Sequence, residues 1–72
     1  MDDAMSLKQK IGGQVKKRRI ELRMEQVDVQ DYAEIGSTTL SRLEQGKANI
    51  TIDRLEKILE VLGLELIVKV KG

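Results

Sequence analysis

Apolar residues recur at helical spacing through most of the chain and divide it into segments. The first segment follows Ser6, a candidate helix N-cap, and its apolar residues share one helical face. These residues are Leu7, Ile11, Val15 and Leu22. Gly12 and Gly13 lie inside the pattern, and each costs a helix interior about 1 kcal/mol relative to alanine. We therefore expect a first helix that begins weakly and becomes firm only after Gly13.

Two shorter helical patterns follow. One runs from about Gln26 to Glu34, and its apolar side consists of Val29, Tyr32 and Ala33. Ile35-Gly36 breaks this pattern, and the next one runs from Ser37 to Glu44 with Leu40 and Leu43 facing inward. Two short helices joined by a tight break of about three residues have the spacing of a helix-turn-helix.

A fourth helix is predicted after a loop at residues 47–50. Gly46 ends the third helix as its C′ residue, Thr51 is the next N-cap, and Asp53 suits the first turn because of the helix dipole. Gly63 ends the fourth helix. The apolar stripe of this helix is the clearest in the chain and consists of Ile52, Leu55, Ile58, Leu59 and Leu62.

After Gly63 the period of the pattern changes from helical to two. Leu64, Leu66, Val68 and Val70 alternate with Glu65, Ile67, Lys69 and Lys71, which is typical of a β-strand. No other segment has strand character, and an unpaired strand leaves backbone N–H and C=O groups unsatisfied. We predict antiparallel pairing with the same strand of a second copy, although a disordered tail remains the alternative. The residues expected to dimerise are Leu64, Leu66, Ile67, Val68 and Val70.

The predicted organisation is a flexible N-terminus at 1–6, one domain at 7–63 and a dimerisation strand at 64–72. Seventy-two residues with no cysteine and no histidine exclude a disulfide framework and the usual thiol or imidazole metal sites. With no proline and one tyrosine as the sole aromatic residue, the core is aliphatic, which favours helices. We expect no membrane span or signal peptide, and therefore a cytoplasmic location. No catalytic constellation, cofactor motif or small-molecule site is evident, so we do not expect an enzyme.

Charge is distributed unevenly although the net charge is only +1. Seven cations and one anion lie between Lys8 and Arg23, whereas the segment from Glu25 to Glu44 is mainly acidic. A basic segment of this kind indicates either a polyanionic partner or a solvated helix face. Arg18 falls on the apolar stripe and Arg19 on its edge, so at least one of them requires an anionic partner.

With the helices placed, the chain resembles the Cro/CI-type (XRE) helix-turn-helix family. The resemblance rests on Gly12-(x)2-Val15, Arg19, Gln26, the run Ser37 to Lys47, Asn49 and Leu55-(x)2-Ile58. The end of the fourth helix, Leu62 to Leu66, is similar to HipB-like antitoxin regulators, in which a dimerising strand follows. The resemblance implies an all-α fold, a four-helix lambda-repressor-like domain, with a C-terminal β-strand that pairs across a homodimer.

The resemblance also implies double-stranded DNA as the partner. It assigns a phosphate contact to Gln26, base-edge contacts to Gly36, Ser37, Thr38 and Arg42, and backbone contacts to Lys47 and Asn49. It further implies an ion pair between Arg19 and Glu44. From the residues themselves, Ser37, Thr38 and Thr39 lie at a helix start that favours an anion, although Ser37 alone would also suit an N-cap. The guanidinium of Arg42 can bond both acceptors of a guanine.

The chain departs from the family pattern in the second helix and the turn. Glu25-Gln26 stands where the family usually begins the second helix with Thr-Gln. Gln30 replaces the usual small residue on which the two helices pack, and Glu34 occupies the turn position that often holds a left-handed glycine. A left-handed Glu34 would cost on the order of 1 kcal/mol. Asp28 and Asp31 add negative charge where phosphates would pass.

Together these observations predict a dimeric, sequence-specific DNA-binding regulator that binds inverted repeats. Autorepression and a role as the antitoxin of a toxin protein follow from the resemblance alone. The alternative is a protein-interaction module of the same fold that has lost specific DNA binding.

Overall fold

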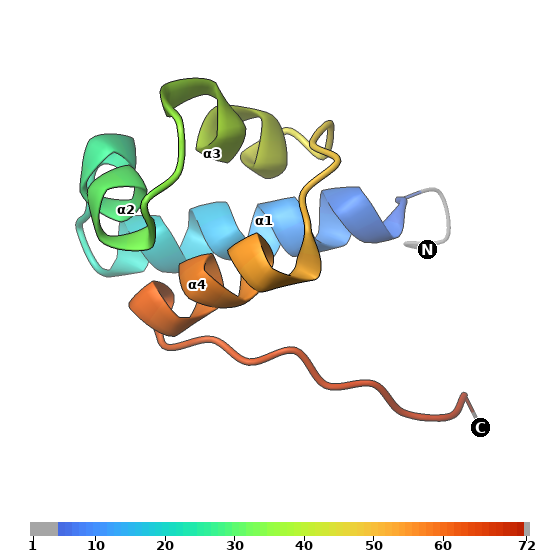
Figure 1. Ribbon diagram of the computed structural model, residues 1–72. Helices are drawn as coiled ribbons and strands as arrows, with labels where there is room; N and C mark the ends of the chain where they lie inside the picture. The colour runs from blue at the N-terminus through green and yellow to red at the C-terminus, as the bar shows by residue number, and fades with distance from the viewer. Residues whose placement is uncertain (1–4, 72) are drawn as a thin grey trace.

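The computed structural model describes residues 5–71 and consists of four α-helices. They are α1 (Leu7–Glu21), α2 (Gln26–Ala33), α3 (Ser37–Glu44) and α4 (Ile52–Leu62). Helix α1 packs against α3 and α4, and α2 also packs against both. In Figure 1, α3 lies above the layer formed by α1 and α4, with α2 at one end, and the chain after α4 extends beneath the domain.

All four helices contribute to one aliphatic core. Its buried residues are Val15 of α1, Val29 and Ala33 of α2, Leu40 and Leu43 of α3, and Leu55, Ile58 and Leu62 of α4. No polar residue among those described is buried as a whole, although the side chain of Glu44 is only 4% exposed. The helical periodicity predicted each of these positions, and the all-helical architecture is confirmed.

Helix α1 is continuous from its first residue, through Gly12 and Gly13. Ser6 and Gln9 form a capping box in which Ser6 Oγ accepts from the Gln9 N–H at 3.1 Å and Gln9 Oε1 accepts from the Ser6 N–H at 2.9 Å. These bonds satisfy backbone donors that would otherwise be free at the helix start. The apolar face is also shorter than predicted, because Leu7 is 69% exposed and Leu22 lies beyond the end of the helix.

Two further apolar side chains that were expected to face inward are exposed. Tyr32 of α2 is 74% exposed and Ile52 of α4 is 80% exposed. Both lie near the ends of short helices, where a residue on the apolar side can extend past its neighbours. Helix α2 also ends one residue earlier than expected, at Ala33, because Glu34 adopts a left-handed conformation.

The segment after α4 does not form a strand within the single chain. Gly63 ends α4 with a φ of 67°, and residues 64–71 continue without regular secondary structure. Leu64 packs against the domain's own core, and its N–H donates to the Leu59 carbonyl at 2.9 Å. The exposed apolar residues of the segment are Leu66, Ile67, Val68 and Val70. The predicted strand and its pairing with a second copy are therefore not confirmed.

Residues 1–4 of the expected flexible N-terminus, and Gly72 of the expected strand, lie outside the described residues. Within residues 5–71, no helix combines the length and the apolar character that crossing a membrane requires.

Candidate nucleic-acid interface

One side of helix α3 packs against the core, and the opposite side is exposed to solvent. Leu40 and Leu43 are almost completely buried beneath it. Ser37, Thr38 and Arg42 lie on the opposite side and are exposed, and Thr39 is half-buried. Gly36 is the N-cap, so Ser37 is the first helical residue and not the cap. No side chain bonds the free N–H groups at this end of α3, which leaves them available to an external acceptor.

The turn between α2 and α3 is built around Glu34. Its φ of 57° and ψ of 46° place it in the left-handed region, where a residue with a side chain is strained. The Ile35 N–H closes the turn by donating to the Gln30 carbonyl at 3.1 Å. Gln30 Nε2 also donates to the Ser37 carbonyl at 3.0 Å, so this long polar side chain joins the two helices.

Arg19 and Glu44 form the ion pair that positions α3. Arg19 Nε lies 2.7 Å from Glu44 Oε2, and Arg19 Nη2 donates to Glu44 Oε1 at 3.1 Å. The side chains of Arg19 and Glu44 are only 12% and 4% exposed. A third bond runs from Arg19 Nη1 to the Met24 carbonyl at 2.9 Å. The hydrogen bond and the charge of Glu44 raise the pKa of the Arg19 guanidinium above its usual value, against the opposing effect of burial.

Gln26 belongs to the same network. Its Nε2 donates to Glu44 Oε1 at 3.1 Å, which ties the start of α2 to the end of α3. Gln26 therefore lies apart from the front of α3, where the other expected DNA contacts gather. Beside it, the Asp28 carboxylate accepts from the Glu25 N–H at 2.9 Å, so one backbone donor at the start of α2 already has an anionic partner.

Arg18, the other cation on the stripe of α1, has a backbone partner. Its Nε donates to the Leu62 carbonyl at the end of α4 at 2.9 Å. Its Nη1 also lies 3.7 Å from the Glu21 carboxylate, which is a weaker, exposed contact.

The loop after α3 brings Lys47 and Asn49 near the same surface. Arg42 Nη2 donates to the Lys47 carbonyl at 3.1 Å, so the guanidinium in this structure lies along α3 toward the loop. Asn49 Oδ1 accepts a hydrogen bond from Lys8 Nζ of α1. Sequence reasoning did not single out Lys8, since it is one of many cations in α1 and only the fold brings it to the loop. Sequence reasoning also did not single out Arg54 in the first turn of α4, because only the fold brings it close to α3.

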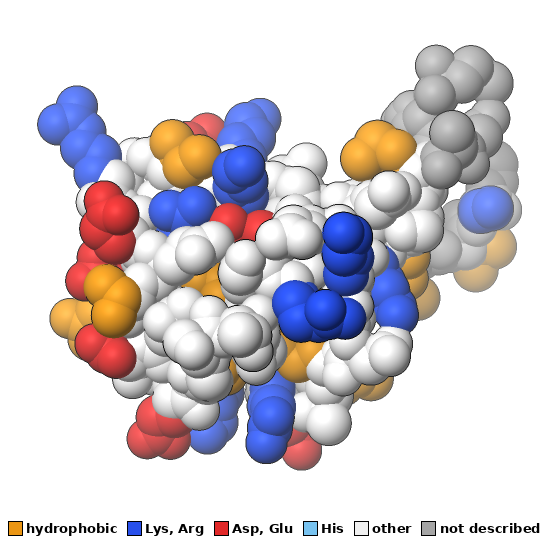
Figure 2. Space-filling model, turned by 90° about the horizontal axis from the view of Figure 1, so that it is seen from above, with side chains coloured by type: hydrophobic (Ala, Val, Ile, Leu, Met, Phe, Trp, Pro, Cys, Tyr) orange, Lys and Arg blue, Asp and Glu red, His pale blue; other side chains and the backbone are white. Residues whose placement is uncertain are grey.

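The charges on this side of the molecule are arranged asymmetrically. Figure 2 shows uncharged polar surface in the middle, acidic side chains along the edge over α2, and basic side chains toward the loop that follows α3. Glu25, Asp28, Asp31 and Glu34 are all exposed on or beside α2. Basic side chains also lie elsewhere on this face, but the end of α3 that adjoins the loop has Arg42, Lys47 and Lys8 and is away from the acidic edge over α2.

Comparison with known proteins agrees with this geometry. A family model described as helix-turn-helix matches residues 15–68, which is three quarters of the chain. No curated protein matches the chain significantly. The matched region contains the whole of α2, α3 and α4 and the ion pair between Arg19 and Glu44. The chain belongs to the Cro/CI-type (XRE) helix-turn-helix family of DNA-binding regulators.

Proposed function

We propose that this protein is a sequence-specific transcriptional regulator that inserts α3 into the major groove of operator DNA. The observation that carries the proposal is the contrast between the two sides of α3. Leu40 and Leu43 fix the helix to the core, whereas Ser37, Thr38 and Arg42 are exposed on the outward side. A helix that is firmly held and carries polar side chains outward suits the reading of base edges.

Each exposed residue has a distinct chemical use. The hydroxyls of Ser37 and Thr38 donate or accept hydrogen bonds, and the threonine methyl can pack against a thymine methyl. Gly36 allows close approach because it has no side chain, and Thr39, which is half-buried, lies at the same helix start. Arg42 uses one N–H for the Lys47 carbonyl, which leaves four for a base such as guanine.

Backbone contacts would come from residues that flank α3. Lys47 and Asn49 lie in the loop at its end, and both are exposed. Gln26 presents the start of α2, but its amide is already bound to Glu44, so we assign it a positioning role in addition to a phosphate contact. The acidic side of α2 opposes phosphate and would confine close DNA contact to the half of the surface that holds Arg42 and the loop.

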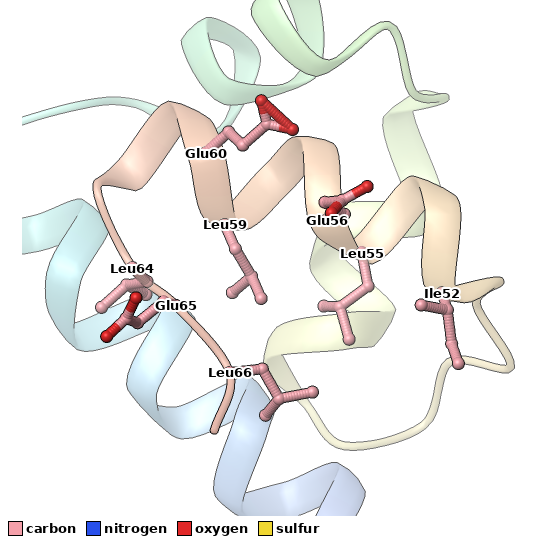
Figure 3. A pocket seen from close by; sticks show the side chains of 8 residues that line it. All are labelled: Ile52, Leu55, Glu56, Leu59, Glu60, Leu64, Glu65 and Leu66. Atoms are coloured by element: carbon pink, nitrogen blue, oxygen red, sulfur yellow. The ribbon is translucent and has the colours of Figure 1, made fainter. Parts of the chain in front are cut away.

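Dimerisation would supply the second half of the operator contact. Ile67, Val68 and Val70 are between 70% and 93% exposed, which is unfavourable for an isolated chain. Leu66 and Ile52 border an apolar hollow of about 380 Å³ along α4, shown in Figure 3. A second copy would cover these side chains and pair the extended segment, and two α3 helices would then read inverted half-sites about one helical turn apart.

The biological role is inferred from the resemblance to HipB-like regulators. We propose autorepression of the protein's own operon, with a toxin protein as a second partner. The exposed acidic side of α2 favours one other function, a protein-interaction module that binds a toxin or another protein without specific DNA binding.

Selection of binding sites from random DNA, followed by mobility-shift titrations over a salt series, tests the regulator. We expect an inverted-repeat sequence and steep salt dependence. Arg42→Ala should relax the preference at one base pair per half-site by about 1–3 kcal/mol, and Arg42→Lys should keep the general affinity but lose that preference. If the selected pool shows no sequence preference and binding does not depend on salt, the interaction module is the better description.

A further inference from the structure

A polar hollow of about 170 Å³ lies along one side of α3. Three segments that are separate in sequence form its wall. Polar side chains from α3, from the loop and from the start of α4 line it, namely Thr38, Thr39, Arg42, Asn49, Thr51 and Arg54. Only the folded chain brings Arg54 to the side of α3 that the proposed function uses.

The hollow is positively charged. Two guanidinium groups, Arg42 and Arg54, border it from different helices, and no carboxylate lines it. Within residues 5–71 the Arg54 side chain has no hydrogen bond or ion pair, and Lys8 adds a third cation through its bond to Asn49. Two cations that border the same hollow repel each other unless an anion lies between them. The arrangement therefore favours an anionic ligand.

The donors of the hollow suit a phosphate group in particular. Guanidinium groups bind phosphate oxygens through paired N–H donors. The backbone N–H of Arg54 donates to Thr51 Oγ1 at 3.2 Å and so caps the first turn of α4. The hydroxyl hydrogen of Thr51 remains for another acceptor. Thr38 and Thr39 of α3 also line the hollow and carry two more hydroxyls. The positive end of the α4 dipole acts in the same direction.

We infer that this hollow binds one phosphate of the DNA backbone, with Arg54 as its main ligand. The inference rests on the proposed function, because the hollow shares Thr38 and Arg42 with the surface that would face the major groove. Free phosphate or a nucleotide offers the same chemistry. A backbone phosphate fits better, because the hollow opens beside the helix that would lie between the two DNA strands.

The first test compares Arg54→Ala with wild type on a selected operator and on unrelated DNA. Affinity should fall about tenfold on both, since a charged hydrogen bond to phosphate carries no sequence information. The slope of log affinity against log salt should become shallower by about 1 for each subunit bound. Lys57→Ala is the matched control, because Lys57 is an exposed cation of the same helix whose Nζ lies 3.6 Å from Glu34. It should leave both quantities unchanged.

A second test locates the phosphate. Operator duplexes in which one phosphate at a time is replaced by an uncharged methylphosphonate should reveal a position in each half-site that weakens wild-type binding. That position should lose its effect in Arg54→Ala and keep part of it in Arg54→Lys, while other sensitive positions are unchanged. Circular dichroism of each variant checks that the fold is retained.

The outcomes separate the inference from the function on which it rests. Wild-type protein that fails to bind any DNA specifically would overturn the proposed function. Wild-type binding that Arg54→Ala and Lys57→Ala affect equally would overturn the phosphate site alone. Titration of inorganic phosphate and of a mononucleotide into the DNA-free protein, followed by NMR, distinguishes the sources. Tight binding there, with no methylphosphonate position linked to Arg54, would also overturn the backbone assignment.

Discussion

Gly12 of α1 lies directly against the backbone of Leu43 in α3. A Cβ atom built on Gly12 would overlap the Leu43 carbonyl oxygen and would lie 3.1 Å from its carbonyl carbon. The two helices approach this closely because Gly12 has no side chain, and Gly12 is fully buried at the contact. Gly13, the next residue, is exposed and has nothing within 4 Å of the corresponding position.

The two glycines should therefore respond oppositely to alanine. Gly12→Ala must push α3 away from α1 and should destabilise the protein by about 3 kcal/mol or more, because backbone cannot move aside as a flexible side chain can. Gly13→Ala should stabilise it by about 0.5–1 kcal/mol, since alanine is the better helix former in open space. Urea unfolding of both variants measures the difference, and equal effects would contradict the close contact.

The Arg19–Glu44 pair should be strongly coupled. Glu44→Ala leaves the nearly buried guanidinium with only the Met24 carbonyl, and it should cost about 3 kcal/mol. Arg19→Met should cost a similar amount, because it leaves the nearly buried Glu44 carboxylate with the Gln26 amide in place of a cation. The double variant should be more stable than the sum of the two losses predicts, and this coupling energy measures the pair. Strictly additive losses would show that the two side chains act independently.

The stabilisation from the Arg19–Glu44 pair should not change as pH rises through the neutral and mildly basic range. Glu44 raises the pKa of Arg19 above its usual value, so the folded chain holds this proton more tightly than the unfolded chain does. The resulting stabilisation is complete below the usual arginine pKa and is lost only as pH rises above it. We expect the coupling energy from the double-variant cycle to remain constant from about pH 7 to about pH 10. A decline within that range would require another titrating group.

Periodicity predicted the core because the core obeys helical geometry. Val15, Leu40 and Ile58 each belong to the apolar stripe of a different helix, and all three are fully buried. The bounds of α3 could also be predicted from the sequence, since Gly36 and Gly46 flank a short run with two inward-facing leucines. The exposure of α3's outward side follows directly from that arrangement.

Features that depend on distant residues could not be read from local sequence. The two glycines of α1 looked alike, and only the approach of Leu43 distinguishes Gly12 from Gly13. The bond from Gln30 to the Ser37 carbonyl likewise depends on how α2 and α3 cross. The partner of Arg19 was predicted as Glu44 only from the family resemblance. The position of Arg54 near Arg42 was not indicated by any pattern in the sequence.

The left-handed Glu34 offers a simple route to higher stability. A residue with a side chain costs about 1 kcal/mol or more at a φ of 57°, so Glu34→Gly should stabilise the chain by up to about 1 kcal/mol. Glu34→Ala is the control, because it keeps the strain and removes only the exposed contact with Lys57, which contributes little. Thermal unfolding compares the two variants. An Ala variant as stable as the Gly variant would show that the turn is not strained.

Dimerisation can be tested without disturbing the core. Because Leu64 packs against the core and its N–H donates to the Leu59 carbonyl, a truncation should retain it. A chain that ends after Leu66 removes residues 67–72 and with them the exposed apolar side chains of Ile67, Val68 and Val70. Light scattering should give about twice the mass of 8.1 kDa for the full chain and a monomer for the truncated one.

Single substitutions in the full chain distinguish strand pairing from a general loss of the tail. Val68 is 90% exposed and falls on the apolar side of the alternation, so Val68→Lys should abolish the dimer if that side is covered by a second copy. Lys69 falls on the other side, and Lys69→Thr should leave the mass unchanged. A monomeric full chain, or a truncated chain with the mass of a dimer, would contradict pairing through this segment. Loss of the dimer should also abolish specific operator binding, because a single small module binds too weakly to compete with non-specific DNA.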